Sequence, residues 1–183
     1  MKLIILDRDG TINHDRDDYV KSADEWIPLN GALEAIAKLN QAGFTTVVAT
    51  NQSGVGRGLY GMTELNAMHE KMQRLLKEVG GRVDAIFFCP HDPEAETCTC
   101  RKPLPGLFEQ IRDRYGADMT KVHSVGDTLR DLEASSAVGC PTHLVRTGKS
   151  ELKVPINLPA NTRIHFDLMS FADWLITSEK AAA

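Results

Sequence analysis

Two aspartates separated by a single residue follow a short apolar segment near the start of the chain. Asp7 and Asp9 come directly after residues 3–6, and Gly10 comes next. If residues 3–6 form a strand that continues into this motif, both carboxylates project to one side, and Gly10 lets the backbone turn closely over a ligand. One carboxylate of such a pair can attack a phosphate ester, while the other moves the proton of the leaving alcohol. Asp7 is therefore our candidate nucleophile and Asp9 our candidate acid and base.

Other polar residues supply what this chemistry needs. A carboxylate and a phosphate dianion repel each other, so a divalent cation has to lie between them, and Asp127 is a suitable further oxygen ligand for Mg²⁺ beside Asp7. The Thr50 hydroxyl and Asn51 would donate to the phosphoryl oxygens, and Lys102 would neutralise their charge. Taken alone, the Asp-x-Asp-Gly motif more often marks a solvated turn. A calcium loop is disfavoured, because its glycine belongs at the sixth position rather than the fourth.

Three of the four cysteines fall within twelve residues, together with a histidine. Cys89, His91, Cys98 and Cys100 supply four ligands suited to tetrahedral Zn²⁺. The alternative is three buried cysteines and a surface histidine, whereas a disulfide framework is disfavoured in a reducing compartment. A closed set of four ligands indicates a structural metal. It would stiffen a zinc-binding loop at about residues 89–102 and hold Arg101 and Lys102 over the phosphate.

The elements that must position these residues alternate between strand and helix. Thr63 is the expected N-cap of the longest helix, Ser178–Ala183 are expected to fray, and the stretch after Gly148 reads as a surface loop. Strands are predicted at residues 3–6, 44–49, 83–88, 122–125 and 142–145, helices at 31–41, 63–79, 106–115 and 129–138, and a last strand and helix within 164–176. This alternation predicts an α/β fold with a doubly wound parallel sheet, in which ligands bind at the carboxyl ends of the strands.

Composition fits one soluble domain spanning residues 1–183. The chain has 21 Lys and Arg against 25 Asp and Glu, a formal net charge of −4, and 42% hydrophobic residues. No basic stripe points to nucleic acid. No apolar run approaches the roughly 18 residues of a membrane span, and the four apolar residues before Asp7 are too few for a signal peptide. We expect a cytoplasmic enzyme without a nucleic-acid or membrane partner.

In order and spacing, the motifs resemble those of the haloacid dehalogenase superfamily of phosphatases. The matching residues are Asp7-x-Asp9-Gly10-Thr11, then Thr50, Lys102 and Gly126-Asp127-x₃-Asp131. The resemblance implies a Rossmann-like core with short loops in place of a large cap domain. It also implies Mg²⁺ held by Asp7, the Asp9 backbone carbonyl and Asp127. Cys89, His91, Cys98 and Cys100 match a zinc loop found within the family.

Longer stretches narrow the resemblance to one branch of that superfamily. DRDGTIN, TNQSGVGRG, CPH…CTCRKP and GDTLRDLE are similar to enzymes that remove the 7-phosphate from a heptose 1,7-bisphosphate during synthesis of lipopolysaccharide core precursors. A sugar bisphosphate needs extra positive charge, which Arg57 or Arg101 would supply to the distal phosphate. The candidate substrate-binding residues are Asn51, Gln52, Ser53, Arg57, Arg101, Asp15 and Asp18. By size and family likeness we expect a monomer.

Other functions remain as alternatives at this stage. A histidinol-phosphate phosphatase is the nearest, although its cationic substrate would gain nothing from Arg57. A phospho-receiver domain also places Asp, Thr and Lys at strand ends, but it keeps its aspartyl-phosphate and does not need an acid at Asp9. A zinc module alone leaves the carboxylates unexplained. His69, His123, His143 and His165 carry no pattern and are expected to be structural.

Overall fold

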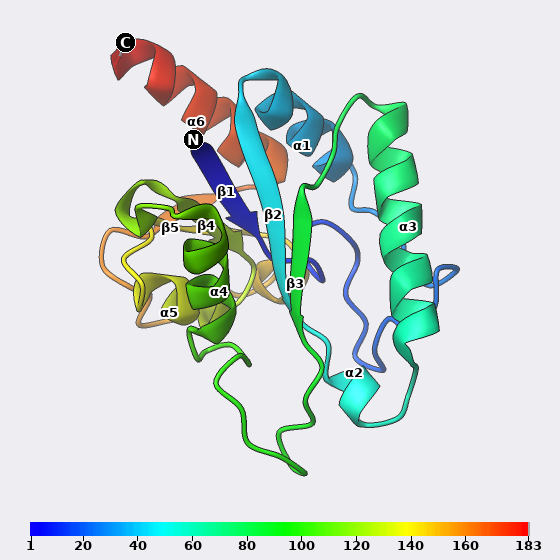
Figure 1. Cartoon of the computed structure of the whole chain (residues 1–183). Helices are drawn as coiled ribbons and strands as arrows, with labels where there is room; N and C mark the ends of the chain where they lie inside the picture. The colour runs from blue at the N-terminus through cyan, green and yellow to red at the C-terminus, as the bar shows by residue number, and fades with distance from the viewer. Residues whose placement is uncertain (183) are drawn as a thin grey trace.

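Six parallel strands form one sheet in the order β3-β2-β1-β4-β5-β6 (Figure 1) in the computed structural model, which describes residues 1–182. The strands are β1 (Lys2–Leu6), β2 (Phe44–Asn51), β3 (Ala85–Cys89), β4 (His123–Gly126), β5 (Thr142–Val145) and β6 (Arg163–His165). The chain starts in the middle of the sheet, builds outward to β3 and returns to β4 on the other side of β1. The order in which strands are added therefore reverses between β1 and β4, and ligands bind at such a switch point in these folds.

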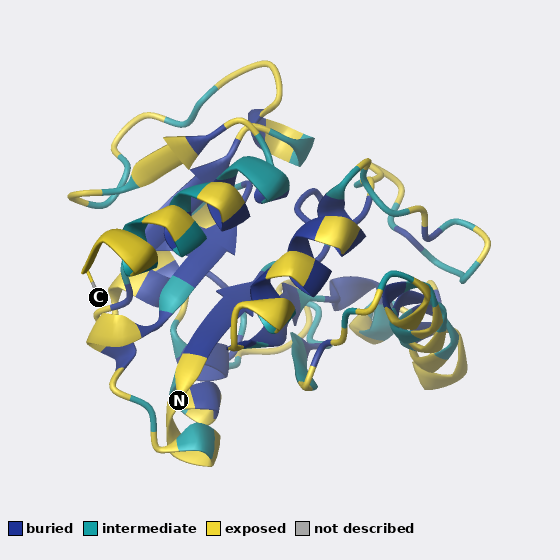
Figure 2. Ribbon diagram, turned by 90° about the horizontal axis from the view of Figure 1, so that it is seen from above, coloured by how far each residue is buried: buried dark blue, intermediate teal, exposed yellow. Residues whose placement is uncertain are grey.

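Helices cover both faces of the sheet, as predicted for a doubly wound fold. One face carries α1 (Ala32–Gln41), α3 (Met62–Glu78) and α6 (Leu168–Ala182), and the other carries α4 (Gly106–Tyr115) and α5 (Leu129–Ser136). Seen from above, the buried strands lie between helices whose outer surfaces are exposed (Figure 2). The remaining helical segments are α2 (Ser53–Gly56) and the 3₁₀ turns η1 (Met119–Lys121) and η2 (Gly148–Ser150).

The apolar run of β1 shows why this strand is central. Leu3 and Ile5 pack into the layer under α4, while Ile4 and Leu6 pack into the layer under α1 and α3, and each is at most 1% exposed. A strand buried on both faces has to be continuously apolar. The first polar residue after it, Asp7, is therefore placed at the carboxyl edge of the sheet.

Three local expectations were wrong. The longest helix begins at Met62 rather than after Thr63, because the Glu64 carboxylate accepts the backbone N–H of Gly61 at 2.8 Å and so caps the helix from its first turn. Residues 178–182 continue α6 instead of fraying, and Lys2 of β1 pairs with Glu179 at 2.6 Å. Ala183, the last residue of the predicted tail, lies outside the described residues. Gly148 to Ser150 form η2 rather than open loop.

Residues 90–105 contain no helix or strand, in agreement with the irregular stretch predicted there. The loop is nevertheless held at its start, because the Cys89 carbonyl accepts the N–H of Gln52 and the Pro90 carbonyl accepts the N–H of Gly56, both at 2.8 Å. Across residues 1–182, every helix is too short or too polar to cross a lipid bilayer.

Candidate active site

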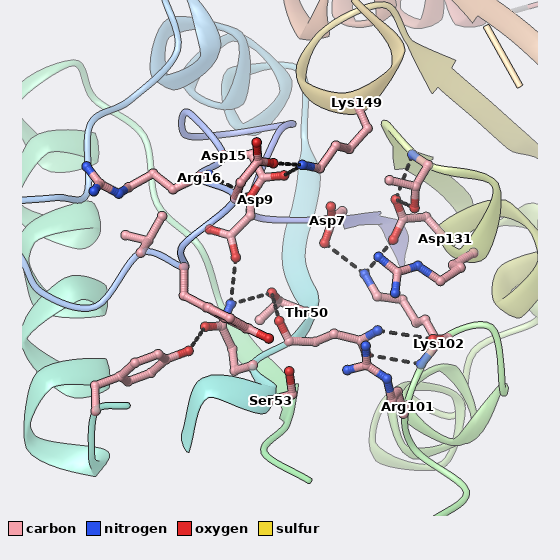
Figure 3. A pocket seen from close by; sticks show the side chains of 18 residues that line it. Asp7, Asp9, Asp15, Arg16, Thr50, Ser53, Arg101, Lys102, Asp131 and Lys149 are labelled. Atoms are coloured by element: carbon pink, nitrogen blue, oxygen red, sulfur yellow. Dashed lines mark hydrogen bonds and ion pairs between the residues drawn. The ribbon is translucent and has the colours of Figure 1, made fainter. Parts of the chain in front are cut away.

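A polar cavity of about 280 Å³ opens at the carboxyl edge of the sheet (Figure 3). Asp7 enters it from the end of β1, Thr50 from β2, and Lys102 from the long loop that follows β3. Residues 15–17, Tyr19, Val20 and Lys149 close another side. Segments far apart in sequence meet here because parallel strands end at the same edge.

Lys102 lies at the centre of this cavity. Its Nζ donates to Asp7 Oδ1 at 2.8 Å, to Asp131 Oδ1 at 2.6 Å and to the Ala49 carbonyl at 2.8 Å. Burial by itself lowers the pKa of Lys102, but the carboxylates of Asp131 and Asp7 outweigh it and hold the pKa above its usual range. Lys102 is therefore a buried, fully paired ammonium. Asp131 belongs to the last recognised motif, but its contact with Lys102 was not foreseen.

Three carboxylates gather around this ammonium. Oxygens of Asp7, Asp127 and Asp131 lie within 4.8 Å of one another. Both oxygens of Asp131 are engaged, since Oδ1 accepts from Lys102 and Oδ2 accepts from the Thr128 N–H and hydroxyl at 3.0 and 2.8 Å. Asp127 Oδ1, in contrast, is buried without a hydrogen-bond partner among residues 1–182. Asp7 and Asp127 are thus the pair with capacity for a cation.

The pKa values show what a cation would relieve. Burial, followed by the charge of Asp131, raises the pKa of Asp7 to about 7. Burial and the neighbouring Asp7 raise the pKa of Asp127 well above its usual range. Hard oxygen ligands with this excess of negative charge suit Mg²⁺. Gly10 allows the close packing, because with φ +86° a Cβ there would lie 2.2 Å from Asp127 Oδ2.

Asp9 points away from Lys102 and joins a different network. Gln52 Nε2 donates to Asp9 Oδ2 at 2.9 Å and to the Thr50 hydroxyl at 2.9 Å (Figure 3). Burial raises the pKa of Asp9, but the Arg8 charge and three side-chain hydrogen-bond donors lower it below the usual value. Asp7 and Asp9, two residues apart, thus have opposite pKa shifts.

Of the predicted substrate-binding residues, the structure brings Gln52, Ser53, Arg101 and Asp15 to the cavity wall. Asn51 also lines it, but both ends of its amide are bound to the Lys102 backbone, at 3.0 Å to the N–H and 3.1 Å to the carbonyl. Its amide therefore positions Lys102.

Arg57 and Asp18 lie outside the set of residues that line the cavity. Arg57 follows the unforeseen one-turn α2 and turns toward the zinc-loop candidate, 3.4 Å from Asp92 and 3.6 Å from Glu94. Asp18 is exposed and pairs with Arg16 at 2.9 Å. The charges of both residues are engaged by acidic or basic neighbours, and their contact with substrate stays a prediction.

Arg130 and Lys149 line the cavity but were not among the predicted site residues. Arg130, in the first turn of α5, faces the cavity beside Arg101. Burial and then the Arg130 charge lower the pKa of Arg101, whose Nη1 is buried without a partner among the described residues. Lys149 reaches across to Asp17 at 2.6 Å and Asp15 at 3.3 Å. The strand-end rule applied to β5 would have drawn attention to Lys149, whereas no sequence signal marked Arg130.

The four metal-ligand candidates of the loop also meet. Cys89 Sγ lies 3.7 Å from Cys98 Sγ and 3.4 Å from His91 Nδ1, and His91 Nδ1 lies 3.2 Å from Cys100 Sγ. A disulfide needs about 2 Å between sulfurs, so these cysteines are free thiols. Two thiolates on tetrahedral Zn²⁺, each about 2.3 Å from the metal, are about 3.8 Å apart. The spacing of the donors therefore fits zinc.

Comparison with known proteins identifies the family. Residues 12–139 match the haloacid dehalogenase-like hydrolases. D-glycero-beta-D-manno-heptose-1,7-bisphosphate 7-phosphatases from Bordetella bronchiseptica and Pseudomonas aeruginosa are 53% and 50% identical, covering 96% and 95% of this chain and 98% and 97% of their own lengths. The crystal structure of D,D-heptose 1,7-bisphosphate phosphatase from B. bronchiseptica complexed with magnesium and phosphate superposes with a TM-score of 0.95 at 52% identity, covering 97% of this chain and 99% of the other. This chain thus belongs to the haloacid dehalogenase-like hydrolases.

Proposed function

We propose that this chain is a Mg²⁺-dependent phosphatase that removes the 7-phosphate of D-glycero-β-D-manno-heptose 1,7-bisphosphate, in the synthesis of lipopolysaccharide core precursors. The observation that carries the proposal is Asp7 in the cavity, held by Lys102 at 2.8 Å and close to Asp127, whose Oδ1 is buried without a hydrogen-bond partner among residues 1–182. This is the arrangement that a carboxylate nucleophile needs in order to accept a phosphoryl group. Relatives of about half-identical sequence carry the name of that activity.

The chain's own residues account for two chemical steps. Asp7 attacks phosphorus through the oxygen that Lys102 does not hold, and the sugar oxygen leaves with a proton from Asp9. Water then attacks the aspartyl-phosphate, giving its proton back to Asp9 and releasing inorganic phosphate and free Asp7. Lys102 and the Thr50 hydroxyl stabilise the phosphoryl oxygens in both steps. Gln52 keeps Asp9 at the cavity wall, 2.9 Å from its own amide nitrogen.

Mg²⁺ would be held by Asp7, Asp127 and the Asp9 backbone carbonyl. Support for this comes from the buried, unpartnered Asp127 Oδ1 and from the raised pKa of both carboxyl groups. Bound there, Mg²⁺ supplies positive charge that lets a carboxylate approach a phosphate dianion.

The distal phosphate is best served by Arg101 together with Arg130. Arg101 has a buried donor without a partner among residues 1–182, whereas Arg57, the other arginine predicted to bind this phosphate, is engaged with Asp92 and Glu94. Guanidinium groups bind phosphate through paired hydrogen bonds. A cationic amino alcohol would be repelled by two arginines, so histidinol phosphate is disfavoured as substrate.

Structural Zn²⁺ in the loop completes the proposal of a single phosphatase domain. Support comes from the tetrahedral spacing of Cys89, His91, Cys98 and Cys100. Cys100 is followed directly by Arg101 and Lys102. Zinc would therefore anchor the two cations that face the substrate.

The test is phosphate release in the presence of Mg²⁺ from both anomers of heptose 1,7-bisphosphate and from histidinol phosphate, measured side by side. We expect one phosphate per molecule of the β anomer and a much lower kcat/KM for the other two compounds. Preference for histidinol phosphate would contradict the assignment of Arg101 and Arg130. Absence of turnover on all three would contradict the proposed substrate class.

A further inference from the structure

Arg8, the residue between the two catalytic aspartates, lies outside the cavity and is completely buried. Its guanidinium uses all three nitrogens. Nε and Nη2 donate to Asp9 Oδ1 at 3.0 and 2.8 Å, Nη2 also reaches Gln52 Oε1 at 3.3 Å, and Nη1 lies 3.1 Å from His69 Nε2 on α3. A buried guanidinium is costly unless it is fully paired. Here two of the three nitrogens pair with Asp9, the candidate acid and base.

The contacts divide the two oxygens of Asp9 into different roles. Oδ1 accepts from Arg8 twice and from Asn13 Nδ2 at 2.8 Å, which occupies its lone pairs. Oδ2 accepts from Gln52 alone among the described residues. Since the Asp9 side chain is 23% exposed and belongs to the cavity wall, Oδ2 is the oxygen with room for a proton and a substrate atom.

His69 anchors the far end of this arrangement. Because an arginine nitrogen can only donate, His69 Nε2 is the acceptor of the contact and the imidazole is neutral. Burial, followed by the Arg8 charge, lowers the pKa of His69 to about 4, which agrees with a neutral ring. Asp9 is thereby connected through Arg8 and His69 to α3, a 17-residue helix.

We propose that Arg8, braced by His69, is a positioning residue that fixes Asp9 so that only Oδ2 delivers the proton to the leaving alcohol. This inference rests on the proposed function and adds to it a residue that does not touch substrate. Lysine cannot replace arginine here, since one ammonium cannot place two donors on Oδ1 and also reach His69. Charge would be kept in Arg8→Lys, but the orientation of Asp9 would be lost.

Leaving-group dependence distinguishes positioning from general structural damage. In a two-step phosphatase, kcat/KM reports steps up to release of the alcohol and is independent of hydrolysis of the aspartyl-phosphate. An alkyl phosphate, such as the heptose bisphosphate, needs a proton on its leaving group, whereas 4-nitrophenyl phosphate has a leaving group that is stable without one. The measured quantity is the kcat/KM for the heptose bisphosphate divided by the kcat/KM for 4-nitrophenyl phosphate. It is determined for each purified variant with Mg²⁺.

We expect Asp9→Asn to lower this ratio on the order of 100-fold, as loss of a general acid does. Arg8→Lys should lower it at least tenfold, and His69→Leu, which strands Arg8 Nη1 without touching Asp9, a few-fold. Arg74→Lys, an exposed change on the same helix, should leave the ratio unchanged. If Arg8→Lys does not fold, as judged by circular dichroism, His69→Leu decides the matter.

An unchanged ratio in folded Arg8→Lys, or in His69→Leu when the lysine variant does not fold, would overturn the positioning role, whatever happens to overall activity. An unchanged ratio in Asp9→Asn would instead overturn the acid role in the proposed function. The two failures are therefore distinguishable from one set of measurements.

Discussion

Residues 1–182 contain two clusters of potential metal ligands, built in opposite ways. The carboxylates of Asp7, Asp127 and Asp131 extend from buried elements at the carboxyl edge of the sheet, and Lys102 pairs with Asp7 and Asp131. The loop cluster of Cys89, His91, Cys98 and Cys100 has no buried cation and lies mostly in a segment without helix or strand. The first cluster has its shape from the sheet, whereas the proposed Zn²⁺ would hold the second cluster together.

This contrast separates chemistry from folding. A preformed site tolerates the loss of a ligand structurally but loses reactivity, while a site made by its metal loses structure first. The two clusters nevertheless meet at Lys102, which follows the last cysteine by two residues and reaches Asp7. Perturbing each cluster in turn therefore tests whether function and stability are divided between them as the structure indicates.

The largest effect is expected from Asp7→Asn. Removing the nucleophile should lower kcat by three orders of magnitude or more. The melting temperature should stay equal or rise, because the native pKa of Asp7, raised to about 7, shows that its charge is unfavourable in the folded state. Phosphate release and thermal unfolding of the same preparation check both expectations. Turnover at the wild-type rate would contradict the role of Asp7, and a large loss of stability would contradict the contrast.

Zinc removal should give the converse result. With four ligands left unbound, the loop loses the contacts through the metal that join its two ends, and we expect a loss of about 3 kcal/mol in the free energy of unfolding, or about 10 °C in melting temperature. Cys98→Ser, at the least buried of the three cysteines, should do the same while leaving the Asp7–Asp127 pair intact. Metal content by mass spectrometry and calorimetry are the measurements. An unchanged melting curve in a verified zinc-free sample would show that the loop holds its own shape.

Both clusters could be predicted from the sequence, but for different physical reasons. The apolar run before Asp7 and the strand-end rule place Asp7, Thr50 and Asp127 at one edge, because parallel strands leave them no other position. The four zinc-ligand candidates were identifiable from residue type alone. Both predictions depend on short-range pattern, and the structure brings each set together.

Long side chains in loops were not predictable in the same way. Arg57 and Arg130 each lie within a few residues of a cavity residue in the sequence. Only Arg130 faces the cavity, because α2 turns Arg57 toward Asp92. Arg8 was passed over because its neighbours carry the motif. The path of a loop and the pairing of a charge are decided by tertiary contacts, which a single sequence does not display.

A third cluster of polar side chains, made of three histidines, differs from the two clusters of potential metal ligands because it is neutral. His123, His143 and His165 lie in a row on β4, β5 and β6 with ring nitrogens 2.9 and 3.0 Å apart, against Phe171 and Trp174 of α6. Arg163 stacks on Trp174, and Glu179 is the acidic group facing His123. His143 and His165 are buried and His123 is half-buried, and the row has no charge to balance.

Acid should therefore destabilise the protein through this row. Burial lowers the native pKa of His165 to about 4, so the unfolded chain binds a proton first as pH falls below about 6.5, and stability is lost between pH 6.5 and 4. For His165 alone we expect the free energy of unfolding to be about 2 kcal/mol lower at pH 4.5 than at pH 7. Denaturant titrations of wild type and His165→Gln check this, since glutamine keeps an acceptor but does not titrate. Equal acid sensitivity in the two proteins would assign the effect to other groups.

The smallest effect lies at the junction of the two clusters. Asn51 binds the N–H and the carbonyl of Lys102, so its amide fixes the last residue of the zinc loop against β2. Asn51→Ala removes two hydrogen bonds worth about 1–2 kcal/mol together, and Lys102 should then reach Asp7 less often. We expect kcat/KM to fall about tenfold with zinc content unchanged, whereas Asn66→Ala on the exposed side of α3 should alter neither. A loss of zinc in Asn51→Ala would mean that β2 organises the loop, and the two clusters would then be one structural unit with two ions.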